Sequence, residues 1–259
     1  MQKISFHKYQ GTGNDFILID NRKSLVDNKD KSLAQKVCDR KFGIGSDGLI
    51  LIKNHPDYDF EMIFFNPDGS QSMCGNGSRC AVQFASELGI INNETTFLST
   101  DGLHTATKKG ETVKLSMRDV AASAILNNDN FYEINTGSPH YVTFVNDLPA
   151  RQVKTEGAAI RNSAQYKAQG INVNFVEKLS NTEIAVRTYE RGVEDETLSC
   201  GTGVTACAIA HVLKGGNAPV KIKTAGGALS VNFELNNKSA KKVFLTGPAV
   251  KVFEGAIIL

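Results

Sequence analysis

The sequence predicts an α+β protein made of two similar αβ domains, each a barrel-like, mainly antiparallel sheet around a central helix. Three observations support this prediction: an internal repeat about half the chain apart, many short apolar or β-branched runs, and one apolar helical stretch in each half. The chain has 259 residues and 41% hydrophobic side chains. It is therefore long enough to fill two cores of about 130 residues each.

The internal repeat is centred on two cysteines. The sequence around Cys74 reads SMCGNGS and that around Cys200 reads LSCGTGV, at an offset of 200 − 74 = 126 residues. Three further pairs keep the same order at nearly the same offset: Phe16–Ile19 with Tyr141–Phe144, Gly43–Gly45 with Gly170–Asn172, and Thr100–Gly102 with Thr224–Gly226. We expect one domain at residues 1–118, with Cys74, and a second at residues 119–259, with Cys200. The final strand is able to pack back on the first domain, and the active site is expected between the domains.

Within each half the predicted order is strands, one helix, and more strands. Residues 61–65 and 183–189 are apolar or β-branched runs that lead toward the two cysteines, as strands are expected to do. Residues 112–115 and 242–245 are predicted late strands. Apolar residues at helical spacing predict a helix from about Asn76 to Leu88, closed by Gly89.

The second predicted helix follows Cys200. Residues 204–213 are apolar nearly all round, and Gly215-Gly216 ends the stretch. A helix without a polar face is buried on most of its sides. This pattern places the second helix in the centre of its domain.

Charge and composition point to a small partner. The 29 basic and 27 acidic side chains nearly balance, so neither a nucleic acid nor a membrane surface is expected as a partner. The first ten residues are polar and charged, without the apolar core of a signal peptide, and a cytoplasmic location is expected. An odd number of cysteines, five, predicts reduced thiols, and their spacing does not match a metal site.

Cys74 and Cys200 are the candidate reactive groups. Each stands where a Gly-x-Gly turn opens a predicted helix, so backbone N–H groups and the positive end of the helix dipole favour a thiolate there. The N–H groups that follow each cysteine are also suited to a substrate carboxylate. Cys38, Cys80 and Cys207 lack this context and are expected to be packing residues.

At these residues the sequence resembles the diaminopimelate epimerase family. The matching segments span nearly the whole chain in order: Gly11–Phe16, Gly43–Gly48, Asn66–Asp68, Met73–Gly77, Gly137–His140, Glu190–Gly192 and Cys200–Gly203. The resemblance implies interconversion of LL- and meso-diaminopimelate, for lysine and peptidoglycan synthesis, without pyridoxal phosphate or any other cofactor. It is compatible with a homodimer.

The resemblance also implies roles for particular residues. Cys74 and Cys200 correspond to the acid–base pair, and His140 and Glu190 to a supporting polar pair. The remaining positions correspond to substrate ligands: Gly75, Asn76, Gly201 and Thr202 at the reacting carbon, and Asn14, Asn66, Asn172 and Arg191 around the substrate and its distal head. A bidentate arginine suits a distal carboxylate.

The sequence departs from the commonest family pattern at three positions. Asn66 lies one residue closer to Cys74, and Glu190 one residue farther from Cys200, than is commonest in the family, and Ser138 replaces a frequent asparagine.

Three other functions are alternatives to the epimerase. They are a proline or hydroxyproline racemase, an isomerase of the phenazine-biosynthesis type, and a thiol redox sensor. Arg191 argues against the first, and the presence of both cysteines argues against the second. Proton exchange at a substrate α-carbon separates the epimerase from the redox sensor.

Overall fold

The computed structural model describes residues 3–258. The chain divides into two compact units. Unit 1 extends to Leu115 and also contains the chain from Gly247 onward, and unit 2 is Ser116–Thr246. No helix within residues 3–258 combines the length and the apolar character that a membrane span requires.

In its described part, unit 1 is built from eight named strands and two helices. The helices are α1 (Lys31–Cys38) and α2 (Gly75–Glu87). The strands are β1 (Lys3–Gly11), β2 (Asn14–Asp20), β3 (Leu49–Lys53), β4 (Phe60–Phe65), β5 (Glu94–Ser99), β6 (Gly102–Lys109), β7 (Thr112–Ser116) and β17 (Val250–Ile258).

Unit 2 is also built from strands and two α-helices. The helices are α3 (Val153–Arg161) and α4 (Gly201–Leu213), with short 3-10 turns η1 (Ala122–Ala124) and η2 (Leu148–Ala150). The strands are β8 (Ile125–Asn127), β9 (Tyr132–Asn135), β10 (Pro139–Phe144), β11 (Asn172–Lys178), β12 (Glu183–Glu190), β13 (Asp195–Thr197), β14 (Val220–Thr224), β15 (Gly227–Asn236) and β16 (Ser239–Pro248). The last two residues of β16, Gly247 and Pro248, belong to unit 1.

The two units share one strand topology, which confirms the predicted fold class. In unit 1, β2–β3 is parallel, β3–β4 antiparallel, β4–β5 parallel, and β5–β6 and β6–β7 antiparallel. In unit 2, β10, β11, β12, β14, β15 and β16 pair in the same parallel and antiparallel order. A parallel pair needs a crossover connection. A helix supplies each one, in the order α1, α2, α3 and α4.

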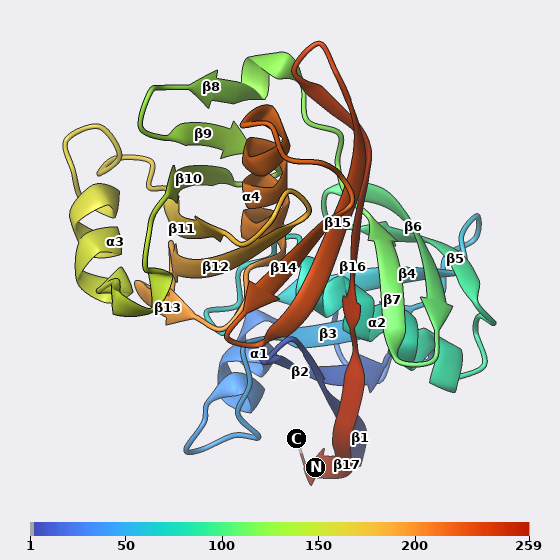
Figure 1. The fold of residues 1–259 in the computed structure, drawn as a ribbon. Helices are drawn as coiled ribbons and strands as arrows, with labels where there is room; N and C mark the ends of the chain where they lie inside the picture. Colours follow the sequence, from blue (N-terminus) through green and yellow to red (C-terminus); the bar gives the residue numbers. More distant parts are fainter. Residues whose placement is uncertain (1–2, 259) are drawn as a thin grey trace. The chain divides into compact units, whose positions relative to one another are not determined.

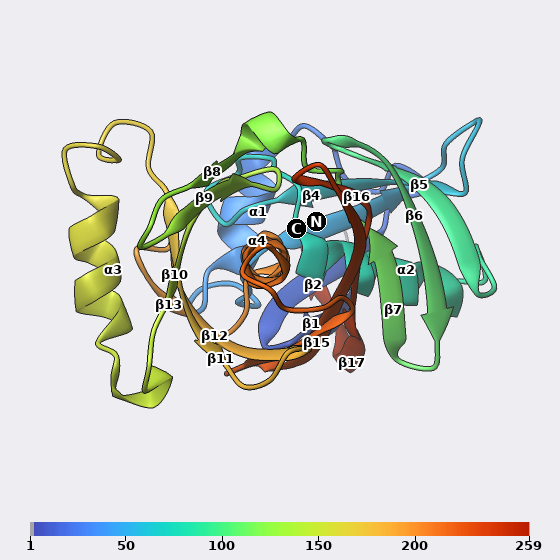
Figure 2. The ribbon, with the colours of Figure 1, turned by 45° about the horizontal axis from the view of Figure 1, so that its top comes forward.

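Helices α2 and α4 are the central helices of their units, close to the predicted bounds. Figure 2 shows α4 nearly end-on, with β9, β10, β11, β12 and β15 curving around it. Its residues from Gly203 to His211 are all buried, as an apolar helix in a core requires. Helix α2 contacts β1, β2, β3 and β4. Leu88 is its C-cap, and the next residue, Gly89, has a φ of +68°, as is common after a helix end.

Helices α1 and α3 were not predicted, so the expectation of one helix per half is wrong. Helix α1 has Asp30 as its N-cap and packs Leu33 and Val37 against the core of unit 1. Helix α3 lies on the outer side of β11 and β12 in Figure 1, and a Cβ at Gly157 would lie 2.4 Å from Cβ of Tyr189. Both helices are short, with 8 and 9 residues, so each offers too few apolar positions for a helix to be recognised from the sequence.

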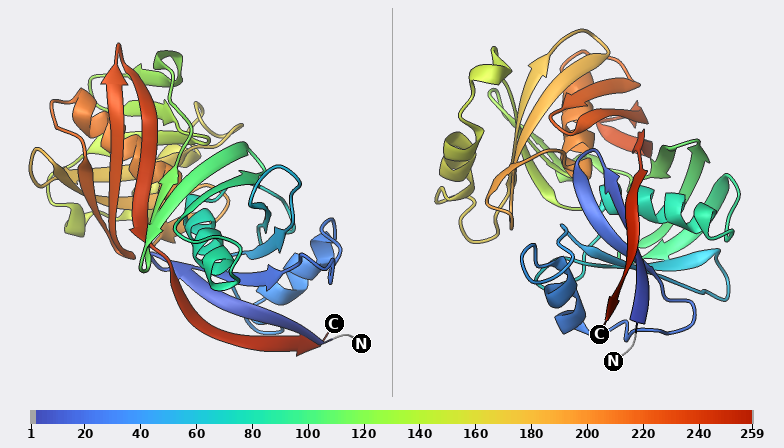
Figure 3. Two further views of the ribbon diagram at one scale, coloured as in Figure 1. Left: turned by 90° about the vertical axis from the view of Figure 1, so that its right-hand side faces the viewer. Right: turned by 90° about the horizontal axis from the view of Figure 1, so that it is seen from below.

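The first and last described strands of unit 1 run side by side. Strand β17 pairs antiparallel with β1, from Lys3 opposite Ile258 to Gln10 opposite Val250 (Figure 3). The final strand is therefore held in unit 1 by main-chain hydrogen bonds to the first.

Candidate active site

Cys74 is the N-cap of α2. Its backbone is extended, with φ −132° and ψ 111°, and its Sγ accepts a hydrogen bond from the N–H of Gly77 at 3.4 Å. The first helical residues, Gly75 and Asn76, follow it directly. A sulfur at this position lies at the positive end of the helix dipole, which favours its ionised form.

Asn14, at the start of β2, contacts the Cys74 loop. Its Oδ1 accepts a hydrogen bond from Nδ2 of Asn76 at 3.2 Å and another from the thiol of Cys74 at 3.7 Å. Its Nδ2 donates to the carboxylate of Asp47 at 2.6 Å, which fixes the orientation of the amide. Unit 1 therefore brings together four of its five predicted site residues: Asn14, Cys74, Gly75 and Asn76.

Asn66 is the exception in unit 1. Its side-chain Nδ2 donates to the hydroxyls of Ser70 at 3.0 Å and Ser72 at 3.1 Å. These contacts close the loop that leads to Cys74. Asn66 is therefore bonded to its own loop, and its amide is not hydrogen-bonded to Asn14 or Asn76.

Cys200 is the N-cap of α4 and has the same backbone conformation as Cys74, with φ −119° and ψ 113°. Its side chain is nearly buried, at 8% exposed. Its Sγ lies 3.5 Å from the hydroxyl oxygen of Thr202. That hydroxyl lies 3.0 Å from Nε2 of His140 and 3.2 Å from the hydroxyl of Ser138.

His140 is fully buried beside the Cys200 loop. Burial, and then the positive charge of Arg191, lower the pKa of His140 to about 3. Its imidazole is therefore neutral at physiological pH. Its Nδ1 lies 3.2 Å from the side-chain amide nitrogen of Asn174, which is also fully buried.

Asn174 was missed by the sequence analysis. It lies on β11, where its neighbours Val173 and Phe175 are buried and apolar. A polar residue inside an apolar strand was the available signal, because a buried amide needs hydrogen-bond partners.

Asn172 and Arg191 lie together in unit 2. Oδ1 of Asn172 accepts from the backbone N–H of Arg191 at 2.9 Å, and its Nδ2 donates to the carbonyl of Pro139 at 3.1 Å. The guanidinium of Arg191 is exposed and donates to the carbonyl of Gln169 at 3.0 Å. Glu190 is half-buried, and its carboxylate accepts from the hydroxyl of Thr197 at 3.0 Å.

The two cysteine loops have matching supports. In unit 1 the side chain of Asn14, from the start of β2, contacts Asn76, two residues after the cysteine. In unit 2 the side chain of His140, from the start of β10, contacts Thr202, again two residues after the cysteine. The repeat therefore extends from the strand topology to the contacts of the loops themselves.

The other three cysteines are buried, as the sequence predicted. Burial raises the pKa of the Cys80 thiol to about 12 and also raises the pKa values of Cys38 and Cys207. These thiols stay protonated at neutral pH. Among the described residues, no group of three or more His, Cys, Asp or Glu side chains has the arrangement of a metal site.

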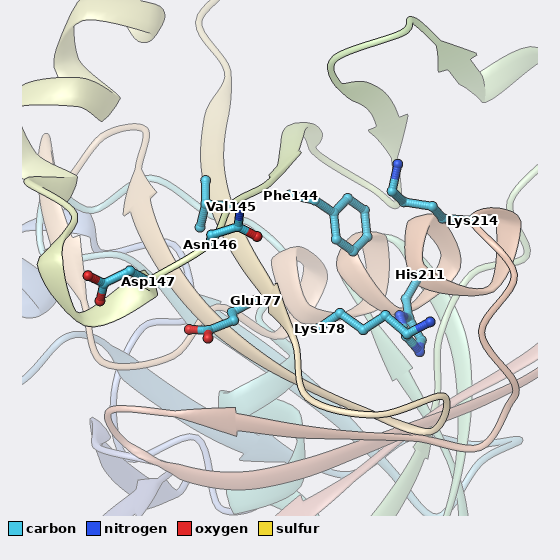
Figure 4. A pocket seen from close by; sticks show the side chains of 8 residues that line it. All are labelled: Phe144, Val145, Asn146, Asp147, Glu177, Lys178, His211 and Lys214. Atoms are coloured by element: carbon cyan, nitrogen blue, oxygen red, sulfur yellow. The ribbon is translucent and has the colours of Figure 1, made fainter.

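A surface pocket of about 330 Å³ lies elsewhere in unit 2 (Figure 4). Its lining includes His211 and Lys214, at the end of α4 opposite Cys200, together with Phe144 and Glu177. None of the predicted site residues lines it, and it is not a candidate for the reaction site.

The chain belongs to the diaminopimelate epimerase family. The family model described as diaminopimelate epimerase matches residues 6–122 and 132–252. The diaminopimelate epimerase of Flavobacterium psychrophilum is 51% identical, with 98% of this chain and 100% of that protein covered. The diaminopimelate epimerase of Aquifex aeolicus is 43% identical, with 98% of each covered.

Solved structures with low sequence identity share the fold. A phenazine biosynthesis protein of the PhzF family from Bacillus anthracis has a TM-score of 0.77 at 15% identity, over the full length of both chains. A hydroxyproline epimerase from Agrobacterium vitis has a TM-score of 0.72 at 14% identity, covering 99% of this chain and 93% of that one. At these identities the likeness is one of fold alone.

Proposed function

We propose that this chain epimerises one α-carbon of LL-diaminopimelate to give meso-diaminopimelate, without a cofactor, in the supply of lysine and peptidoglycan precursors. One observation carries the mechanistic part of the proposal. Each of two units with the same topology has a cysteine as the N-cap of its central helix, within the same Cys-Gly-x-Gly sequence.

The reaction needs one base and one acid. The thiolate of one cysteine takes the α-proton, which leaves a carbanion, and the thiol of the other cysteine gives its proton to the opposite face of the same carbon. The two sulfurs exchange protonation states in the process, and no electrons are gained or lost. Stereoinversion requires the acid and the base on opposite faces of the carbon, and each unit contributes one of them.

The carboxylate at the reacting carbon would be held by backbone N–H groups at the helix starts. Gly75 and Asn76 are the first two residues of α2, and Gly201 and Thr202 are the first two of α4, so their N–H groups are directed out of the helix starts. Such groups bind anions well. The same dipole that favours the thiolate would stabilise negative charge that develops on the substrate carboxylate during deprotonation.

The distal end of the substrate is assigned to Arg191 and the asparagines. The exposed guanidinium of Arg191 suits a carboxylate, and the amides of Asn14, Asn66 and Asn172 suit the charged groups of an amino acid. His140 and Glu190 are assigned as supporting residues. Because His140 bonds to Thr202, whose hydroxyl contacts Cys200, it orients the loop without carrying charge.

The test follows stereochemistry and isotope together. The reduced protein is incubated with LL-diaminopimelate in deuterated water, and both the meso isomer and the α-deuterium content are measured. Cys74→Ala and Cys200→Ala are each expected to abolish formation of deuterated meso isomer. Cys38→Ala, which removes a buried thiol from the outer helix α1, is expected to keep activity and serves as the matched control.

Two other outcomes contradict the proposal. Exchange with proline or hydroxyproline, but not with diaminopimelate, would assign the chain to a related racemase. Absence of exchange with all three substrates by freshly reduced protein would favour a thiol redox role for Cys74 and Cys200.

We also propose a cytoplasmic homodimer. The cytoplasm is where precursors of lysine and peptidoglycan are expected to be made, and the thiol mechanism needs reduced cysteines. Strand β17 exposes Val252, Phe253 and Ile258, which a second copy of the chain would cover. Light scattering coupled to size exclusion tests the dimer, and a monomer at micromolar concentration contradicts it.

A further inference from the structure

Arg79 is a fully buried arginine on α2, five residues after Cys74. Its guanidinium has three hydrogen-bond acceptors: the carbonyl of Gly75 at 3.5 Å, the hydroxyl of Thr12 at 3.2 Å and the carbonyl of Pro248 at 3.3 Å. One of these acceptors belongs to the residue directly after the candidate base. The side chain therefore ties the start of α2 to two other segments of unit 1.

The charge of Arg79 has no carboxylate beside it. All three acceptors are neutral oxygens, and no described carboxylate lies within salt-bridge distance of its guanidinium. A buried cation in that position is costly unless an anion is near it. The guanidinium interacts electrostatically with the thiols of Cys80, the next residue on α2, and Cys74, the N-cap of the same helix.

Only one of these two thiols is suited to be the anion. Cys80 is completely buried, and its pKa of about 12 keeps it protonated at neutral pH. Cys74 is half-exposed at a helix start, with the N–H of Gly77 directed at its sulfur. Burial lowers the pKa of Arg79 itself to about 10, so the guanidinium still carries its charge at neutral pH.

We propose that Arg79 is a positioning residue whose positive charge favours ionisation of Cys74 to the thiolate. This inference rests on the proposed function of Cys74 as an acid–base group. Arg79 acts through the cysteine and the Gly75 carbonyl, not on the substrate.

The repeat supplies an internal comparison. The position equivalent to Arg79 in unit 2 is 79 + 126 = 205, which is Thr205. Its hydroxyl donates to the carbonyl of Gly201 at 2.9 Å, so it makes the same helix-start contact as Arg79 without a charge. The two helix starts therefore differ in charge: a buried cation contacts the residue after Cys74 in unit 1, and a neutral hydroxyl contacts the residue after Cys200 in unit 2. Cys74 is expected to ionise at lower pH than Cys200.

Other titratable groups around α2 do not replace Arg79. From β1, Tyr9 is buried near Cys80, and burial raises its pKa far above neutral. From β2 and the loop before β3, Asp15 and Asp47 face the Asn14 side of Cys74. Arg40 bonds to both carboxylates, and Lys8 also pairs with Asp15, so their negative charge is largely compensated.

The experiment measures thiol ionisation directly and needs no substrate. In a Cys200→Ala background, the rate of alkylation of Cys74 by iodoacetamide is followed against pH, with the modified residue identified by mass spectrometry. Arg79→Met is expected to raise the midpoint by about one pH unit or more and to slow alkylation at neutral pH about tenfold. Arg79→Lys is expected to give less than half of that shift, because it keeps the charge.

Arg22→Met is the matched control. It removes the same charge from unit 1, but Arg22 is paired with the carboxylate of Asp20, and the midpoint of Cys74 is expected to stay unchanged. If Arg79→Met folds and the pH midpoint for alkylation of Cys74 is unchanged, the proposal is overturned. This holds even if epimerase activity falls, because the role of Arg79 would then be purely structural.

A second measurement keeps the proposal testable where Arg79→Met does not fold. The midpoint of Cys200 is measured in a Cys74→Ala background and compared with that of Cys74 in the Cys200→Ala background, both with Arg79 intact. A lower midpoint for Cys74 supports the proposal, and equal or reversed midpoints overturn it. Failure of the epimerase assignment would appear separately, in the exchange assay with LL-diaminopimelate.

Discussion

The side-chain amide of Asn174 donates a hydrogen bond to Nδ1 of His140, with 3.2 Å between the two nitrogens. The amide cannot be turned around, because its Nδ2 also donates to the carbonyl of Tyr141 at 2.9 Å and its Oδ1 accepts from the hydroxyl of Thr188 at 3.0 Å. Nδ1 is therefore the acceptor, and the neutral imidazole carries its proton on Nε2. That proton is directed at the hydroxyls of Thr202 and Ser138.

The first prediction concerns this tautomer. Asn174→Asp places a carboxylate beside Nδ1, which moves the imidazole proton to Nδ1 and raises the pKa of His140. We expect kcat to fall by about tenfold or more, in line with the effects of residues that orient a reactive group. Long-range ¹H–¹⁵N NMR should show the Nε2–H form in the parent and the Nδ1–H form in the variant. Asn162→Asp, at an exposed position of the same unit, should leave both readouts unchanged.

The second prediction is a pH dependence of stability. The folded-state pKa of His140 is about 3, below its ordinary value of 6.5, so the unfolded chain binds more protons between these two values. The stabilisation is complete above pH 6.5 and is lost as the pH falls toward 3, by up to about 1.4 kcal/mol per pH unit. Urea unfolding between about pH 7 and pH 5 should show a smaller slope for His140→Gln than for the parent. Equal slopes for the parent and for His140→Gln would falsify the prediction.

The third prediction compares equivalent glycines of the two helix starts. A Cβ at Gly203 would lie 2.6 Å from Oδ1 of Asn174 and 3.3 Å from Sγ of Cys200, whereas a Cβ at Gly77 would have its nearest atom, Cδ1 of Ile50, at 3.2 Å. The end of an isoleucine moves more easily than a buried, hydrogen-bonded amide. Gly203→Ala should therefore lower kcat by about 100-fold, compared with about tenfold or less for Gly77→Ala. Equal losses in the two variants, measured in the exchange assay, would contradict this account.

The fourth prediction tests recognition of the distal carboxylate. Arg191→Lys keeps the charge but loses the planar, two-pronged donor geometry. The KM for LL-diaminopimelate should rise by about tenfold or more, with a smaller change in kcat. Arg118→Lys, another exposed arginine of unit 2, is the control and should leave KM unchanged. A loss confined to kcat would mean that Arg191 acts at the reacting carbon instead.

The sequence was sufficient for the elements with a strong local signal. The Cys-Gly-x-Gly repeat and the apolar residues after it predicted the positions of α2 and α4, because the helix start and the apolar periodicity are local properties. Helices α1 and α3 were missed because each has only 8 or 9 residues, too few for a clear apolar pattern. Their position against a sheet is decided by contacts with β3, β11 and β12, which the sequence of the helix alone does not specify.

The roles of individual side chains divide in the same way. The sequence by itself determined the family, the two cysteines and the residues next to them, since these lie within short motifs. Only the tertiary structure decided that Asn174 fixes the tautomer of His140 and that Arg79 is a buried cation without a carboxylate. Burial and hydrogen-bond partners depend on strands and loops from distant parts of the chain. The burial of Arg79, for example, depends on Thr12 and Pro248, which the sequence alone does not place beside it.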